Sequence, residues 1–236
     1  MSILKKLGIG LVVLIAIIAI FIFFVTRGDT ATLSMDEVTG DDPVLDEPDA
    51  ETFPTVAIAD PVGWEEGETP AAAEGLTVER FAVGLDHPRT LYTLPNGDVL
   101  VSLTRSPNQE SEGILSWITN TLMNKAGATG PSANEVVLLR DADGDGNAET
   151  RRVLIDGLDS PSGLAYADGI LYVANHDQVL AFPYELGSDR VTAKPRKVID
   201  LAGGGGHWMR NLKLHPEGNL LYIAVGSDTN IGDKGM

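Results

Sequence analysis

A unit of strand, tight turn and strand occurs three times in this chain, and this repeat constrains the fold more than any other feature. The copies are GLDHPRTLYTLPNGDVLVSLT from Gly84, GLDSPSGLAYADGILYVAN from Gly157 and GGGGHWMRNLKLHPEGNLLYIAVGSD from Gly203. Their turn glycines are Gly97, Gly169 and Gly218. Without an inserted segment at 105–131, the spacing approaches the roughly 40 to 50 residues of a four-stranded propeller blade. The repeat therefore predicts an all-β fold of the β-propeller type.

The third copy contains a histidine directly after four consecutive glycines, Gly203 to Gly206. Glycine has no Cβ, so such a run can turn tightly and lets a ligand approach its backbone. We therefore expect His207 to lie on a loop at the start of a hairpin. A propeller blade can deliver a catalytic group to the central channel in this way.

The N-terminus carries an apolar run. Lys5 and Lys6 precede 19 residues, Leu7 to Val25, that contain no charged side chain. At about 1.5 Å per residue, this run is just long enough to cross a bilayer core of roughly 30 Å. Cleaved signal peptides have a shorter apolar core and a small-residue cleavage site, so residues 1–27 are interpreted as a cytoplasmic n-region and an uncleaved signal anchor. The lysines favour a cytoplasmic N-terminus. They predict a single-pass protein of the inner (cytoplasmic) membrane, with the propeller on the periplasmic or extracellular side.

Residues 28–75 are interpreted as an acidic disordered tether. From Gly28 to Glu79 there is no Lys or Arg, and there are 15 Asp or Glu. The net charge of −17 is therefore largely a property of the tether. Residues 76–236 are assigned to a partial propeller domain. It has no basic patch interleaved with aromatic residues, which argues against nucleic acid as a partner. The chain has no cysteine, which excludes disulfides, a thiolate nucleophile and cysteine metal ligands.

Within the insertion at 105–131, the segment ILSWITNTLMNKAG places apolar residues at near-helical spacing and ends at Gly127. This pattern predicts a short amphipathic helix. The helix would cover a sheet edge or the propeller rim. Alternatively it would face a membrane or a partner, since Trp117 suits an interface.

A second motif, DADGDG, places Asp141, Asp143 and Asp145 at alternate positions around a glycine turn. Calcium takes several oxygen ligands, which this spacing can supply. An EF-hand is excluded, because position twelve is Arg152 in place of glutamate and predicted strands flank the loop. The remaining interpretations are a calcium loop carried by a hairpin and a polar turn without metal. In the calcium loop, the further ligands are Asn147 and Glu149.

These segments together resemble the glucose and sorbosone dehydrogenase family that uses pyrroloquinoline quinone (PQQ). The resemblance rests on SANEVVLLRDADGDGNAETRRVLIDGLDSPSGLAYADGILYVANHD and on GHWMRNLKLHPEGNLLYIAVGSDTN. The first repeat and the NKAGATGPSAN end of the insertion look like the L-sorbosone dehydrogenase branch. The resemblance implies a six-bladed propeller that binds quinone and sugar at the channel mouth. About three blades are present, so the chain looks like an N-terminal portion. We expect an incomplete chain, with a half propeller that needs a complementary partner as the alternative.

The resemblance also implies roles for individual residues. His207 matches the general base that takes a proton from a sugar hydroxyl or aldehyde hydrate as hydride passes to the quinone. Arg89 and Arg210 would suit the quinone carboxylates, because a guanidinium fork pairs with planar oxygens. Asn211 and Asp228 are weaker candidates for cofactor contacts.

For Arg210 and Asn211, a purely structural role is equally well supported. In that role they would form hydrogen bonds at the blade edge and would not contact the cofactor. The other histidines are interpreted as turn or surface residues: His87, His176 and His215.

The function predicted from these observations is the oxidation of a sugar or sugar aldehyde by a membrane-anchored, PQQ-dependent enzyme, with calcium as a second cofactor. Its partners would be a small sugar, the membrane through residues 7–25, and an electron acceptor in that membrane. Two alternatives come from other classes: a propeller binding module without catalysis, and a calcium-dependent propeller hydrolase with His207 as its base.

Overall fold

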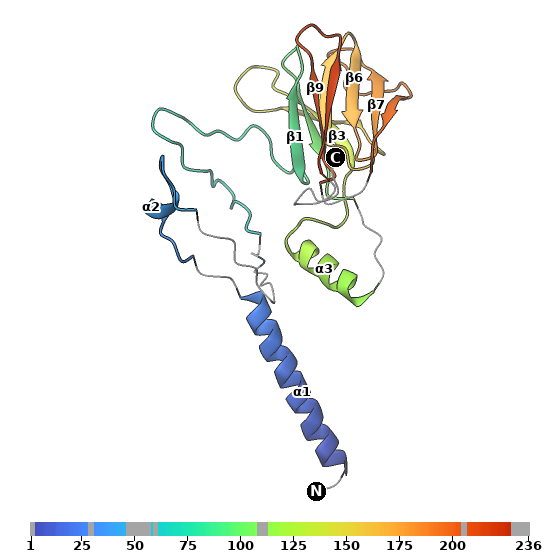
Figure 1. Ribbon diagram of the computed structural model, residues 1–236. Coiled ribbons are helices and arrows are strands. Elements are labelled where there is room, and N and C mark those ends of the chain that lie inside the picture. The colour runs from blue at the N-terminus through green and yellow to red at the C-terminus, as the bar shows by residue number, and fades with distance from the viewer. Residues whose placement is uncertain are drawn as a thin grey trace. The chain divides into compact units, whose positions relative to one another are not determined.

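The computed structural model describes residues 3–27, 31–45, 58, 61–107, 113–203 and 207–227. The chain divides into two compact units, Met1–Pro61 and Val62–Met236 (Figure 1). The first unit contains the long N-terminal helix, and the second contains the β-sheets.

The first unit is dominated by α1 (Ile3–Thr26), an apolar helix with exposed side chains. Its segment Lys5–Thr26 has a mean hydropathy of 3.2, which is sufficient by length and composition for a membrane span or a signal sequence. One short helix, α2 (Met35–Val38), lies in the stretch interpreted as a tether. It begins after Ser34, whose backbone N–H donates to the Glu37 carboxylate at 2.8 Å.

The second unit is built from antiparallel sheets in which each strand pairs with its neighbour in sequence. The first sheet has the order β1 (Pro88–Thr93), β2 (Val99–Leu103), β3 (Glu135–Arg140), β4 (Thr150–Ile155). The second has the order β5 (Gly163–Ala167), β6 (Ile170–Ala174), β7 (Gln178–Pro183), β8 (Arg196–Asp200). The third pairs β9 (Arg210–Leu214) with β10 (Leu221–Val225). Four-stranded antiparallel sheets of this kind are the blades of a propeller.

The turn glycines of the repeat lie between the first two strands of each sheet. Gly97, Gly169 and Gly218 have φ angles of 91°, 76° and 72°, in the left-handed region that residues with a Cβ rarely adopt. Each therefore closes the hairpin that the repeat predicts. The predicted helix in the insertion is also present, as α3 (Ile114–Lys125) between β2 and β3.

The core forms where the first two sheets pack face to face. Alternation along β2 and β3 sends Leu100 and Leu138 into the cluster shared with the second sheet. It sends Val101 and Val137 to the other face, where Phe81 packs against them. Both faces of the first sheet are therefore covered, which explains the continuous apolar runs in its central strands.

The second sheet contacts the third, two-stranded sheet where β5 packs against β9. A Cβ at Gly163 of β5 would collide with the Arg210 carbonyl oxygen of β9. The Ser162 hydroxyl lies beside this contact, accepts from the Arg210 backbone N–H at 2.8 Å and donates to the Arg210 carbonyl at 3.1 Å. β10 alternates between half-buried and exposed residues, and among the described strands β9 is its sheet neighbour. The blade number of a whole propeller stays a prediction.

Antiparallel pairing sorts the loops to two ends of the sheets. We call the end of the sheets at which β1, β5 and β9 begin the entry end. The segments that follow β2 and β6 lie at the same end. The turns that close the hairpins β1-β2 and β3-β4 lie at the opposite, far end. This sorting decides which candidate residues can act together.

Candidate functional site

His207 lies at the entry end, three residues before β9, and its side chain is exposed. Its Nδ1 lies 2.8 Å from the backbone carbonyl of Ser227, beyond the end of β10. A carbonyl only accepts hydrogen bonds, so Nδ1 carries the proton and Nε2 of the neutral ring carries a lone pair. A Cβ at Gly226 would lie 2.6 Å from the Cβ of His207, so glycine permits this close approach. The arrangement presents a nitrogen base to solvent.

Arg210 is the first residue of β9, and only 1% of it is exposed. Its Nη1 donates to the carbonyls of His207 at 2.6 Å and Met209 at 3.2 Å, and its Nη2 donates to Ala202 at 2.7 Å. Burial lowers the pKa of this guanidinium. The side chain therefore ties together both ends of the loop that carries His207. These contacts favour the structural one of its two predicted roles.

Arg89 in β1 is exposed and reaches the same loop. Its guanidinium carbon lies 5.8 Å from the ring centroid of Trp208, which is 7% exposed, and its Nε donates to the Thr104 carbonyl at 3.4 Å. In the part of the chain that the structure describes, Arg89 forms no ion pair. The structure thus places an available cation beside the His207 loop.

The two weaker cofactor candidates differ in what the structure shows. Asn211 is exposed in β9 and is opposite Ala224 in the ladder. Asp228 lies outside the described residues.

The DADGDG loop joins β3 to β4, so it lies at the far end, away from His207. The strands on either side agree with a hairpin-borne loop. Asp141 accepts backbone N–H bonds from Gly146 at 2.9 Å and Gly144 at 2.7 Å, and these bonds lower its pKa. Carboxylate oxygens of four predicted ligands lie within 4.8 Å of one another: Asp141, Asp143, Asp145 and Glu149. The fifth, Asn147, instead donates its side-chain amide to Asp145 at 3.0 Å.

The sequence profile of the TrAA12-like family matches residues 70–235. The chain belongs to the TrAA12-like family. The matched region includes His207, Arg89 and the DADGDG loop. No curated protein matches the chain.

Solved structures also resemble the TrAA12-like chain. The iodide structure of Trichoderma reesei Carbohydrate-Active Enzymes Family AA12 is 22% identical, with a TM-score of 0.51 over 68% of this chain and 35% of that one. The calcium structure of the same protein has a TM-score of 0.50 at the same identity and coverage. The holo form of the pyranose dehydrogenase PQQ domain from Coprinopsis cinerea is 17% identical, with a TM-score of 0.46 over 62% of this chain and 29% of that one. The chain thus spans about a third of its relatives' length, and the two Trichoderma structures show a shared fold.

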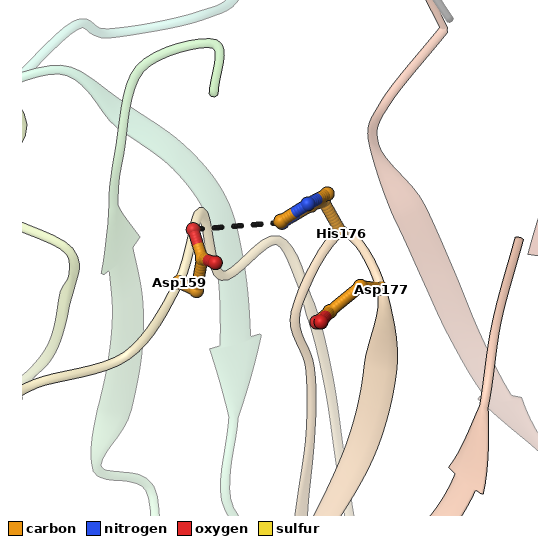
Figure 2. A group of neighbouring side chains, drawn as sticks. All are labelled: Asp159, His176 and Asp177. Carbon is orange, nitrogen blue, oxygen red and sulfur yellow. Dashed lines mark ion pairs between the residues drawn. The ribbon is translucent and has the colours of Figure 1, made fainter. Parts of the chain in front are cut away.

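The TrAA12-like domain contains a second polar cluster that sequence reasoning missed. Asp159 lies between β4 and β5, and His176 and Asp177 form the turn between β6 and β7, so all three lie at the entry end (Figure 2). His176, interpreted as a turn or surface residue, does lie in a turn, and 19% of its side chain is exposed. A signal was present in the repeat, because DHP and DSP place Asp86 and Asp159 at the same point before a blade's first strand.

Proposed function

We propose that this chain is part of a PQQ-dependent dehydrogenase for a sugar or sugar aldehyde, in which His207 is the general base. The observation that carries the proposal is the bond from His207 Nδ1 to the Ser227 carbonyl, because it leaves Nε2 as an exposed proton acceptor. Family membership and the resemblance of the GHWMRN segment to quinone-dependent sugar dehydrogenases support it. Aldoses of the sorbosone or glucose type are the proposed substrate class.

The residues at the entry end fit an anionic planar quinone. Arg89 supplies an exposed guanidinium that is already held over the Trp208 ring, and a guanidinium pairs with a carboxylate through two parallel hydrogen bonds. Arg210 also remains a proposed contact, through its Nε, which has no hydrogen bond among the described residues. Asn211 and Asp228 remain proposed contacts. When bound, the quinone would supply the two-electron acceptor for the substrate's hydride.

His207 performs the proton transfer in this proposal. Nε2 removes the proton from the substrate hydroxyl, and the ring becomes an imidazolium that keeps its Nδ1–H bond to the Ser227 carbonyl. Since the side chain is exposed, the proton can then pass from Nε2 to solvent. Arg210 acts as a positioning residue, because its Nη1 holds the His207 carbonyl at 2.6 Å.

We further propose that α1 is an uncleaved anchor in the inner membrane, which would place the enzyme near an electron acceptor in that membrane. The apolar length of the helix supports this assignment. Calcium is proposed for the DADGDG loop, where it would brace the hairpin. It would not take part in proton transfer, because the loop lies at the far end.

The test compares His207→Asn with His215→Gln in the full-length protein, solubilised in detergent and supplied with PQQ and calcium. His215 lies in the β9-β10 turn at the far end, which makes it a matched control. We expect His207→Asn to bind PQQ but to lose roughly 10²- to 10⁴-fold in kcat for dye reduction by aldoses, and the control to keep its activity. Unchanged turnover in His207→Asn, or no PQQ binding by the unmodified protein, would overturn the proposal. Hydrolysis of a lactone without quinone would favour the hydrolase alternative, and sugar binding without turnover the binding module.

A further inference from the structure

The first two blades carry side chains of opposite charge at one equivalent position, Arg105 in the first and Asp177 in the second. Thr104 and His176 occupy equivalent positions after the second strand of their sheets; the Thr104 N–H donates to the His87 carbonyl, and the His176 N–H donates to the Asp159 carbonyl, one residue earlier in the repeat. The residue after Thr104 is Arg105, which forms an ion pair with Asp86 at 3.2 Å. The residue after His176 is Asp177, which faces Asp159. The second blade thus has a carboxylate where the first has a guanidinium.

This exchange places two carboxylates together, with His176 beside them and no Lys or Arg partner among the described residues. Ligand atoms of Asp159, His176 and Asp177 lie within 4.8 Å of one another, and no Lys or Arg within the described ranges pairs with either aspartate. His176 Nδ1 lies 3.5 Å from Asp159 Oδ1 (Figure 2). His176 Nδ1 and Asp177 Oδ1 are both buried and form no hydrogen bond there. Buried polar atoms are nearly always satisfied, and a cation between these groups would satisfy both.

We propose that Asp159, His176 and Asp177 bind a divalent transition metal ion of the zinc class. One imidazole and two carboxylates form a mixed nitrogen and oxygen donor set, which suits zinc better than calcium, whose ligands are oxygens. Zinc bonds to these donors measure about 2.0 to 2.2 Å, so two ligands of one ion lie within roughly 4.4 Å. The three ligand atoms, which lie within 4.8 Å of one another, are close to that limit.

The surroundings leave room for further ligands. A cavity of about 470 Å³ lies beside the cluster and is lined by Asp159 and His176 together with polar side chains. The hydroxyls and amide on its wall belong to Ser106, Ser132, Ser160 and Asn134. Three protein ligands and an accessible cavity leave a fourth position open to water or to an oxygen of a bound molecule.

The site also lies against the loop that carries His207. The Asp177 carbonyl accepts from the Leu201 N–H at 2.6 Å, and a Cβ at Gly203 would lie 3.4 Å from the Cβ of Asp177. A metal ion that fixes Asp177 would therefore fix the start of the glycine run. The proposal itself requires neither quinone nor sugar.

The test is calorimetric titration of the full-length, chelator-treated protein in detergent with Zn²⁺, and separately with Ca²⁺. We expect one zinc site whose affinity falls by more than about tenfold in His176→Gln, because that change removes the only nitrogen ligand. The control Asp141→Asn should keep zinc binding, and any calcium binding should respond to Asp141→Asn and not to His176→Gln. Asp159→Asn changes a carboxylate that is 59% exposed, so it tests the ligand set with little risk to folding.

Two further measurements distinguish loss of the metal site from loss of folding. Far-UV circular dichroism checks that each variant is folded, and Co²⁺ absorption in the visible range reports nitrogen and oxygen coordination directly. Absence of saturable zinc binding would overturn the proposal, and so would zinc binding that survives His176→Gln or that is lost in His207→Gln alone. None of these readouts depends on dehydrogenase activity, so failure here is distinct from failure of the proposed function.

Discussion

Replacing Arg210 by methionine tests whether this arginine is primarily structural. Methionine keeps much of the apolar volume but removes three hydrogen bonds from a side chain that is 1% exposed. Each bond contributes roughly 1 to 1.5 kcal/mol net, and somewhat more because the donor is charged, so the loss amounts to about 3 to 5 kcal/mol. Arg89 occupies the corresponding place in the first blade, but it is exposed and holds one 3.4 Å bond and a contact with Trp208. Arg89→Met should cost about 1 kcal/mol or less.

The assay is urea unfolding of the full-length protein, followed by tryptophan fluorescence. For an m-value near 2 kcal/mol/M, Arg210→Met should lower the midpoint by about 2 M, and Arg89→Met by at most about 0.5 M. PQQ titration of the same variants should show the opposite order, with the larger loss in Arg89→Met. The reasoning fails if Arg210→Met unfolds at the midpoint of Arg89→Met while losing more of the PQQ affinity, because Arg210 would then be a ligand and not a brace.

Two other substitutions test the packing. Asp98 is 3% exposed and accepts from Arg140 at 2.7 and 2.9 Å, and these bonds lower its pKa. The stability it contributes is therefore present above the unfolded value of about 3.9 and lost as the pH falls through the lower folded pKa. Asp98→Asn should cost about 2 to 4 kcal/mol at pH 7, and the urea midpoints of variant and parent should converge toward pH 2; a constant difference would contradict this. Gly163→Ala should cost about 1 to 3 kcal/mol in thermal unfolding, because its Cβ meets the Arg210 carbonyl, and Gly63→Ala, with open space around it, is the control that must stay near zero.

The hairpins could be predicted from sequence because their signals are local. Alternating apolar residues and a glycine at each turn specify strand, turn and strand, and Gly97, Gly169 and Gly218 all adopt the positive φ that the turns require. The DADGDG loop is local in the same sense, since its backbone N–H groups bond to side chains of the loop itself. Antiparallel pairing then places this loop opposite His207, a result that requires only the strand order.

The features that the sequence did not predict depend on residues that are distant along the chain. Arginine is usually exposed, and nothing in RNLKL shows that Arg210 is buried, because β9 packs on β5, a strand far earlier in the chain. The cluster around His176 arises in the same way, since two separate turns must meet at the entry end. Spacing within a motif carries no information about either contact.

The two ends of the sheets therefore carry different kinds of polar groups. At the far end, Arg140 forms ion pairs with both Asp98 and Asp189, so these three charged groups have partners within the fold. At the entry end, His207 Nε2 forms no hydrogen bond with the described residues, and a buried oxygen of the Asp177 carboxylate has no hydrogen-bond partner among them. A buried unsatisfied oxygen such as that of Asp177 costs stability unless a ligand completes its bonding, whereas the exposed His207 side chain is in contact with solvent. They lie together because each blade begins at that end. Changes to Asp98 and Arg140 should therefore alter unfolding midpoints first, and changes to His207, Arg89 and His176 should alter ligand binding or turnover first.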